Sequence, residues 1–286
     1  MERIRTVGVV GAGTMGQGIT QVCAMQGFET LLFDVNPAQV ERALHQATNS
    51  LESLAQKGKL TPEEQRLIRS RIAPAKQLTE LKVDLIIEAA IERLDVKQDL
   101  FVRLETINGG KAILATNTSS ISISKIASAL KDPSLCVGLH FFNPAERMKL
   151  VEVISGERTS PAIRDLMIAF SRVLGKTAVL AKDSPGFIVN RVARHYYVES
   201  LKLLSDKAAD VPGIDRLLRA SGFKMGPFEL MDLIGVDTNL SVTTSIYEGF
   251  GRVHKFAPSP IQQQLVRDGH LGRKSGKGFY SYEEKK

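Results

Sequence analysis

A histidine and a glutamate twelve residues apart are the side chains of this sequence best suited to acid–base chemistry. His140 directly follows the apolar run Leu135–Leu139, and Glu152 lies within the apolar run Val151–Ile154; both runs are typical of strands. A carboxylate in an apolar strand is costly unless it has a partner. Because histidine has an ordinary pKa near neutral pH, a His–Glu pair could take the proton from an alcohol as hydride leaves its carbon. The alternative is a core histidine bonded to backbone and a glutamate that faces solvent.

A polar cluster follows another apolar run. Thr116–Ser120 comes directly after Ala112–Ala115, which is typical of a strand. Since ligands of open α/β sheets lie at the carboxyl ends of the strands, the hydroxyls and the Asn117 amide could face such a ligand. The alternative is a capped helix start, in which the N-cap is Ser119, Ser120 or Ser122.

Asn190 is a further candidate for a ligand contact. Around it, Ile188, Val192 and Tyr196 form the apolar face of a helix, so the asparagine points elsewhere. Asparagine is unfavourable inside a helix, and its presence favours a functional role. A solvent-facing asparagine is the alternative.

A glycine-rich turn indicates what the first strand binds. Residues 7–10 have the composition of a buried parallel strand, and residues 11–16 then fit the pattern G-x-G-x-x-G. The first glycine would permit a tight turn, the second would let the backbone approach a pyrophosphate, and the third would let helix pack close to strand. Free N–H groups at the start of the helix would point at the phosphates. The residues of this predicted cofactor loop are Gly11, Ala12, Gly13, Thr14, Met15 and Gly16.

The second strand ends in a carboxylate that indicates which dinucleotide is bound. Thr30–Phe33 is followed by Asp34, eighteen residues after Gly16. A carboxylate at this point accepts hydrogen bonds from both ribose hydroxyls and repels a 2′-phosphate, so NAD is favoured over NADP. Glycine-rich turns are often only turns, but strand, glycines, helix, strand and Asp34 in this order predict dinucleotide binding.

The order of elements predicts two domains. Strand and helix patterns alternate through about residue 184, which indicates a Rossmann-type doubly wound α/β sheet, and from Pro185 onward only helical patterns remain. We therefore expect an NAD-binding domain over residues 1–184 and a smaller all-α C-terminal domain over residues 185–286. The predicted strands are Thr6–Val10, Thr30–Phe33, Val83–Glu88, Ala112–Ala115, Leu135–Leu139, Val151–Ile154 and Thr177–Ala181. Four C-terminal helices are expected to begin at Pro185, Pro212, Pro227 and Pro260.

A long charged segment interrupts the alternation. Residues 37–59 are longer than a minimal crossover helix, and Thr61–Pro62 then begins another charged helix. These patterns predict a helical hairpin at about residues 37–71 that projects from the sheet. From the residues alone, the hairpin could contact a ligand or be a solvated surface excursion.

Composition limits the class of protein. With 43% hydrophobic residues the chain has ample core, but no apolar stretch reaches the roughly 18 residues that span a bilayer. The N-terminus runs directly into the first strand, leaving no room for a signal peptide. Cys23 and Cys136 are best interpreted as small buried hydrophobes, which suits a reducing cytoplasm. We expect a cytoplasmic enzyme with no membrane contact and no metal.

The net charge of +7 has several possible causes. Nucleic acid is one, but the basic residues are spread along the chain and no nucleic-acid-binding motif occurs. Ordinary solvated faces and a substrate that carries several phosphates are sufficient causes, so no nucleic acid is expected.

Taken together, the motifs resemble the short-chain L-3-hydroxyacyl-CoA dehydrogenases, most closely the bacterial 3-hydroxybutyryl-CoA members. The resemblance covers nearly the whole chain, and several such motifs in one order are highly specific. It rests on the segments 11–16, 115–120, 138–144, 148–154, 183–191, 226–230 and 272–280. One departure is Glu146–Arg147, where relatives tend to carry apolar residues, and it puts the acyl-chain preference in doubt.

The resemblance implies NAD-dependent oxidation of (S)-3-hydroxyacyl-CoA, with short acyl chains, to 3-oxoacyl-CoA, and the reverse reaction. His140 would be the general acid/base with Glu152 as its partner, and the C-terminal helical domain would carry a homodimer interface. Ser119 and Asn190 would bind the substrate oxygen, and Asn143 would help to position the reactive groups. Contacts to NAD would come from Asp34, Glu92, Lys97, Asn117, Asn143 and Lys274, and contacts to the coenzyme A moiety from Ser50, Lys57 and Ser119.

Two other functions compete with this hypothesis. One is a related NAD-dependent dehydrogenase of a free hydroxy acid or a sugar acid such as gulonate; the hairpin and Lys57 favour a coenzyme A ester instead. The other is a non-catalytic NAD-binding protein. A protein that only binds has no need of a paired base, so His140 and Glu152 speak against it.

Overall fold

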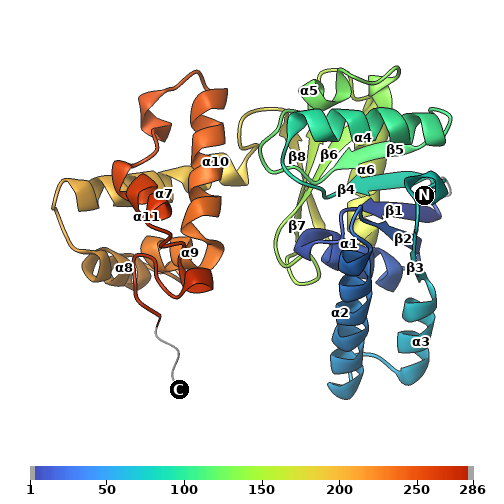
Figure 1. Ribbon diagram of the computed structural model, residues 1–286, viewed down its shortest axis with the longest axis horizontal. Helices are drawn as coiled ribbons and strands as arrows, with labels where there is room; N and C mark the ends of the chain where they lie inside the picture. The colour runs from blue at the N-terminus through green and yellow to red at the C-terminus, as the bar shows by residue number, and fades with distance from the viewer. Residues whose placement is uncertain (1–3, 283–286) are drawn as a thin grey trace. The chain divides into compact units, whose positions relative to one another are not determined.

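The computed structural model describes residues 4–282, which fall into two compact units (Figure 1). The first unit is Met1–Ser184 and the second is Pro185–Lys286. Among the described residues, none of the helices combines the length and the apolar character needed to cross a membrane.

The first unit is built on one eight-stranded sheet in the order β3-β2-β1-β4-β5-β6-β7-β8. All neighbouring strands are parallel except β6 and β7, which are antiparallel. The strands are β1 (Thr6–Val10), β2 (Glu29–Phe33), β3 (Ile72–Pro74), β4 (Leu85–Glu88), β5 (Ile113–Thr116), β6 (Cys136–Phe141), β7 (Leu150–Ser155) and β8 (Thr177–Lys182). The helices of this unit are α1 (Thr14–Met25), α2 (Pro37–Gln56), α3 (Pro62–Ser70), α4 (Leu94–Ile107), α5 (Ile123–Ala127) and α6 (Pro161–Val173).

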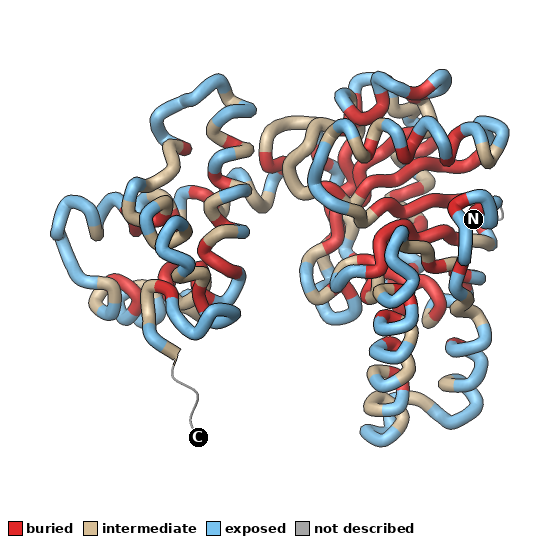
Figure 2. The backbone as a smooth tube through the Cα atoms, viewed as in Figure 1, coloured by how far each residue is buried: buried red, intermediate tan, exposed pale blue. Residues whose placement is uncertain are grey.

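The core of the first unit lies along the central strands. Strands β4, β5 and β6 are buried along their whole length, which Figure 2 shows as red tube through the middle of the sheet. Strands buried on both faces are continuously apolar, which explains why their sequences are runs rather than alternations. The doubly wound α/β fold predicted from those runs is confirmed.

Two details of the sheet differ from the sequence expectation. The edge strand β3 was not predicted, because it has only three residues and ends at Pro74. Strand β6 extends to Phe141, so His140 lies inside the strand and not after it. The reason is the antiparallel partner β7, whose residues Val151 and Glu152 pair with Phe141 and His140 and so prolong β6.

Helices α2 and α3 project together from one end of the sheet (Figure 1). Thr61 begins α3 with a capping box, in which its hydroxyl accepts from the Glu64 N–H (3.1 Å) and the Glu64 carboxylate accepts from the Thr61 N–H (2.8 Å). The base of the hairpin is fixed by a small cluster of Ala24, Leu51 and Ile68. This cluster, which is separate from the main core, therefore holds the base of the hairpin against α1.

The second unit contains only helices and is packed around Tyr197, Leu201, Ile214, Phe228 and Met231. Its helices are α7 (Val189–Ser205), α8 (Val211–Ala220), α9 (Pro227–Ile234), α10 (Val236–Gly249) and α11 (Pro260–Arg267). Three of the four prolines expected at helix starts lie in the first turns of α8, α9 and α11.

The expectation for Pro185 was wrong. Helix α7 begins at Val189, because Gly186 (φ 72°) and Phe187 (φ 49°) have left-handed backbone that a helix starting at Pro185 could not contain. Asn190 consequently lies in the first turn of α7 rather than in a helix interior.

Candidate active site

The antiparallel pairing of β6 and β7 places His140 directly opposite Glu152. The His140 Nδ1 and the Glu152 Oε2 are 2.8 Å apart, and the two side chains are only 7% and 1% exposed. A hydrogen bond shielded from water in this way is stronger than one at the surface. The carboxylate fixes the orientation of the imidazole ring, which also contacts the ring of Phe142 with 4.5 Å between centroids. The structure therefore contains the hydrogen bond between His140 and Glu152 that the sequence predicts.

Asn117 joins the turn after β5 to the end of β6. Its Oδ1 accepts a hydrogen bond from the Phe141 N–H (2.8 Å), one residue beyond His140. Its own N–H donates to the Glu88 carbonyl (2.7 Å). The polar turn Thr116–Ser120 therefore lies beside the strand that carries His140. Of the three serines considered as helix caps, Ser122 is the one that caps α5.

The Glu92 carboxylate binds the same turn from the other side. Its Oε1 accepts hydrogen bonds from the Thr118 hydroxyl, the Ser119 N–H (3.0 Å) and the Ser120 hydroxyl (3.2 Å). Burial alone would raise the pKa of the Glu92 carboxyl, but the Lys97 ammonium and these hydrogen bonds outweigh it and lower that pKa. Glu92 is therefore an anion that orders the backbone around Ser119.

The three glycines of the first turn have different structural roles. Gly11 has φ +100°, and a Cβ there would lie 2.5 Å from the Ala89 carbonyl oxygen. A Cβ on Gly16 would overlap the Gly11 carbonyl oxygen. Around Gly13, in contrast, a Cβ would meet nothing within 4 Å. Gly11 and Gly16 are needed for packing, whereas Gly13 leaves an open face over the loop.

That open face belongs to a cleft that fits a dinucleotide. A cavity of about 550 Å³ is lined by Gly11, Gly13, Asp34, Ala90 and Ile91 among others. Asp34 accepts hydrogen bonds from the Ala12 N–H (2.7 Å) and the Asn36 N–H (2.9 Å), which fix its carboxylate at the rim. Gly13 is the N-cap residue of α1 and gives no side-chain cap, so N–H groups of the first turn of α1 are available to an anion.

The other predicted contacts are distributed more widely. Lys97 is buried (1% exposed) between Glu88 and Glu92, and Asn143 is exposed in the loop after β6. On the hairpin, the Ser50 hydroxyl accepts from the Gln21 amide (3.0 Å), and Lys57 is exposed directly after α2.

Two predicted contacts belong to the helical unit. The carbonyl of Asn190 accepts from the Arg194 guanidinium (3.3 Å), and the Lys274 ammonium bonds the Asp237 carboxylate (2.7 Å). Each of these residues is thus held by a neighbour within its own unit.

Comparison with known proteins gives a consistent result. Residues 6–184 match the family model for the NAD-binding domain of 3-hydroxyacyl-CoA dehydrogenase, and residues 186–282 match the model for its C-terminal domain. The chain belongs to the 3-hydroxyacyl-CoA dehydrogenase family. Members of this family are NAD-dependent oxidoreductases, so the sequence predictions of an enzyme and of NAD as its cofactor are confirmed.

The chain matches some members of this family over their whole length and others over only part of it. It is 45% identical over 284 residues to the 3-hydroxyadipyl-CoA dehydrogenase of Escherichia coli, covering 99% of this chain and 60% of that protein. It is 38% identical over 278 residues to the 3-hydroxybutyryl-CoA dehydrogenase of Clostridioides difficile, covering 96% of this chain and 99% of that protein. The crystal structure of (S)-3-hydroxybutyryl-CoA dehydrogenase PaaH1 from Ralstonia eutropha superposes with a TM-score of 0.94 at 38% identity, covering 98% of this chain and 100% of that one.

One buried group at this edge of the sheet is absent from the sequence predictions. Glu88 is fully buried at the end of β4, where it bonds Lys97 and the Thr116 hydroxyl. A glutamate that ends the apolar run Leu85–Ile87 was the available signal, since a buried carboxylate needs partners.

Asp34 is expected to set the choice of cofactor. We expect kcat/KM for NADH to exceed that for NADPH by at least about tenfold, because like charges about 4 Å apart repel by roughly 1–4 kcal/mol. The Asp34→Ser variant should lose much of this preference. Initial rates with both cofactors check this, and comparable efficiency with NADPH in the parent protein would refute it.

Proposed function

We propose that this protein interconverts (S)-3-hydroxyacyl-CoA and 3-oxoacyl-CoA with short acyl chains, such as 3-hydroxybutyryl-CoA. The observation that carries the proposal is the buried His140–Glu152 hydrogen bond of 2.8 Å, in a chain of the 3-hydroxyacyl-CoA dehydrogenase family. When bound, NAD would accept the hydride that leaves the substrate carbon. The residues of the chain then have to move one proton and hold one oxygen.

His140 is assigned the proton transfer. Its Nδ1 is bonded to Glu152, so its Nε2 takes the proton of the substrate hydroxyl in oxidation and returns it in reduction. The imidazolium formed in oxidation is balanced by the Glu152 carboxylate, as in other His–carboxylate pairs. Ser119 and Asn190 are assigned hydrogen bonds to the reacting oxygen, and Asn143 a role in positioning the reactive groups.

The reaction is tested by initial rates of NADH oxidation with acetoacetyl-CoA. We expect turnover of acetoacetyl-CoA and none of free acetoacetate or of sugar acids such as gulonate. Equal turnover of the free acids would favour the alternative dehydrogenase. If none of these substrates is turned over and NADH still binds tightly, the protein is a non-catalytic NAD-binding protein.

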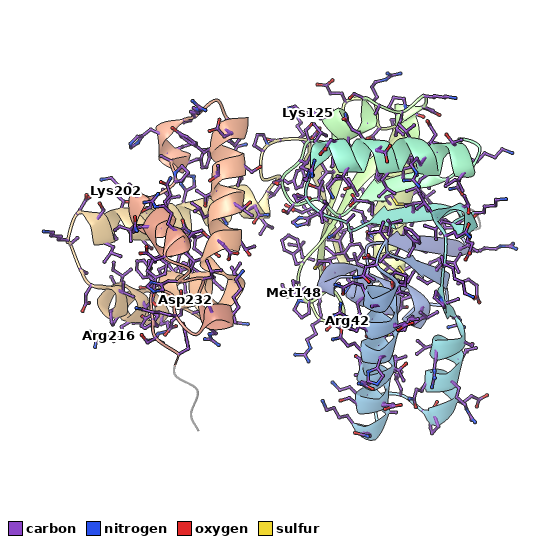
Figure 3. All side chains as sticks on the ribbon, in the orientation of Figure 1. Arg42, Lys125, Met148, Lys202, Arg216 and Asp232 are labelled. Carbon is purple, nitrogen blue, oxygen red and sulfur yellow. The ribbon has the colours of Figure 1, made fainter. Side chains whose placement is uncertain are left out.

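A second substrate is favoured by two observations. The Escherichia coli relative is named for 3-hydroxyadipyl-CoA, whose acyl chain ends in a carboxylate. In this chain Arg147 is exposed and directly precedes Met148 on the segment that follows β6. Figure 3 labels Met148 on that segment. A guanidinium at the rim of the acyl site would bind such a carboxylate. Rates with 3-oxoadipyl-CoA and with uncharged chains of the same length distinguish this substrate from acetoacetyl-CoA.

Lys57 is expected to bind the phosphates of coenzyme A. It lies seven residues, about two helical turns, after Ser50, so both can face one side of the hairpin. Lys57→Ala should raise KM for acetoacetyl-CoA about three- to tenfold, leave KM for NADH unchanged, and have less effect at high salt. Lys131→Ala, another exposed lysine of the first unit, is the matched control. If both KM values are unchanged in both variants, the hairpin is a solvent-exposed projection that does not bind coenzyme A.

We also propose a cytoplasmic homodimer formed through the helical unit. Both cysteines, Cys23 and Cys136, are buried and unpaired, which suits a reducing compartment. The helical unit exposes large apolar side chains, including Val192 (67%), Leu217 (66%) and Phe223 (52%), which a dimer interface would cover. Light scattering during gel filtration measures the mass, and a monomer at micromolar concentration would contradict the dimer.

A further inference from the structure

Glu88 occupies the centre of the nucleotide-binding edge of the sheet. It is the last residue of β4, pairs with Val10 of β1 and Thr116 of β5, and is fully buried. The chain turns directly after all three of these residues. The turn after β1 holds the glycine loop, and the turn after β5 holds Ser119.

The Glu88 carboxylate accepts three short hydrogen bonds. One comes from the Ala90 N–H (2.6 Å), one from the Lys97 ammonium (2.7 Å) and one from the Thr116 hydroxyl (2.6 Å). Ala90 lines the 550 Å³ cleft, so the first bond sets the position of a cleft wall. The third bond fixes the last residue before the turn of Ser119. One carboxylate thereby holds the turn after β4, which lines the cleft, in register with the turn after β5.

Lys97 extends this network from the interior to the partly exposed Glu92. Its ammonium is 3.3 Å from the Glu92 carboxylate as well as 2.7 Å from Glu88, and its side chain is 1% exposed. The side chain of Glu92 is 38% exposed and bonds the Ser119 N–H (3.0 Å). A continuous chain of contacts therefore runs from Glu88 through Lys97 and Glu92 to the backbone of Ser119.

We propose that Glu88 is a positioning residue for the cofactor: it locks Lys97 in the interior, and through Lys97 it holds Glu92 and the Ser119 turn in the form that binds NAD. The inference rests on the proposed function only in taking this cleft as the site of the dehydrogenase cofactor.

Glu88→Gln keeps the size of the side chain and removes its charge. The Lys97 ammonium then keeps Glu92 as its one charged partner and turns toward it, which disturbs the Ser119 turn. We expect the dissociation constant for NADH to rise at least about tenfold, the loss typical of a hydrogen bond to a charged group. If the variant binds NADH as tightly as the parent protein, or more tightly, Glu88 does not position the cofactor site. That outcome overturns the proposal.

A double variant keeps the test decisive if Glu88→Gln fails to fold. Glu88→Gln with Lys97→Met removes both buried charges, so no unpaired charge remains to destabilise the protein. We expect parental thermal stability but still weak NADH binding. Without the Lys97 ammonium the pKa of Glu92 rises, so NADH affinity should also fall between neutral and mildly acidic pH, as Glu92 becomes protonated. If the double variant binds NADH as tightly as the parent protein at every pH, Glu88 and Lys97 have only a structural role, and the proposal is overturned.

Glu105→Gln is the matched control. Glu105, on α4, is another buried carboxylate, but it accepts from the backbone N–H groups of Lys131 and Asp132, just before β6 begins. We expect a lower melting temperature and unchanged NADH affinity. A loss of affinity as large as that of Glu88→Gln would show a general effect of destabilisation, against the proposal. Because NADH binding is titrated directly, these results stand apart from any failure to reduce acetoacetyl-CoA, which would contradict the proposed function alone.

Discussion

The His140→Gln variant is expected to lose about 10²–10⁴-fold in kcat with acetoacetyl-CoA, the contribution typical of general acid–base catalysis. Glutamine can still accept or donate a hydrogen bond beside Glu152, but it cannot exchange a proton with the substrate oxygen. NADH affinity should change little, because His140 belongs to β6 and is absent from the cleft lined by the glycine loop. Steady-state rates and an NADH titration measure the two effects separately.

Two comparison variants show whether the loss belongs to the pair. Glu152→Gln should retain the fold and lose much of the rate, because the imidazolium then lacks its counter-charge. His45→Gln, on the exposed face of α2, makes the same chemical change away from β6 and should leave kcat unaltered. Near-normal turnover of purified His140→Gln would remove this residue from the mechanism.

Gly16→Ala is expected to lose NADH binding together with stability. Its new Cβ would overlap the Gly11 carbonyl oxygen, so α1 has to move away from the end of β1. Overpacking of this kind costs about 1–3 kcal/mol or more, and the movement also displaces the first turn of α1 from the phosphate site. Thermal unfolding and an NADH titration check both effects.

Gly13→Ala separates the two roles of the loop. A Cβ at Gly13 meets no protein atom within 4 Å, so stability should be retained. If the pyrophosphate crosses the loop at this glycine, the methyl group occupies its place and NADH affinity falls. Parental affinity of Gly13→Ala would place the cofactor elsewhere, and parental stability of Gly16→Ala would contradict the packing role of that glycine.

The parts of the fold that could be predicted are those specified by local sequence. Buried parallel strands are apolar runs, and a glycine turn followed by an acidic residue at the next strand end marks the cofactor edge. Strand β3 has no such signature, because it is a three-residue edge strand that ends in Pro74. The start of α7 depends on the left-handed backbone of Gly186 and Phe187, which composition does not reveal.

The residues of the candidate site could be predicted from the sequence, but most of the contacts between them could not. His140 and Glu152 were recognised as a pair because each was unusual in an apolar run. Their geometry depends on the antiparallel pairing of β6 with β7, a long-range choice that neither run specifies. The Glu88–Lys97 contact was missed for a related reason. A lysine among the charged residues of α4 is expected at the surface, and only tertiary packing reveals that it is buried.

The antiparallel register of β6 and β7 has a consequence for how such enzymes can diversify. The opposition of His140 and Glu152 is encoded in strand pairing, so the distance between them is independent of how many residues join the two strands. Exposed residues of the connecting segment, such as Glu146 and Arg147, can therefore be exchanged without changing how His140 and Glu152 face each other. A one-residue slip within either strand, in contrast, would turn one partner to the opposite face of the sheet. Under the proposed roles of Arg147 and His140, substrate range and chemistry belong to adjoining stretches of chain that can evolve independently.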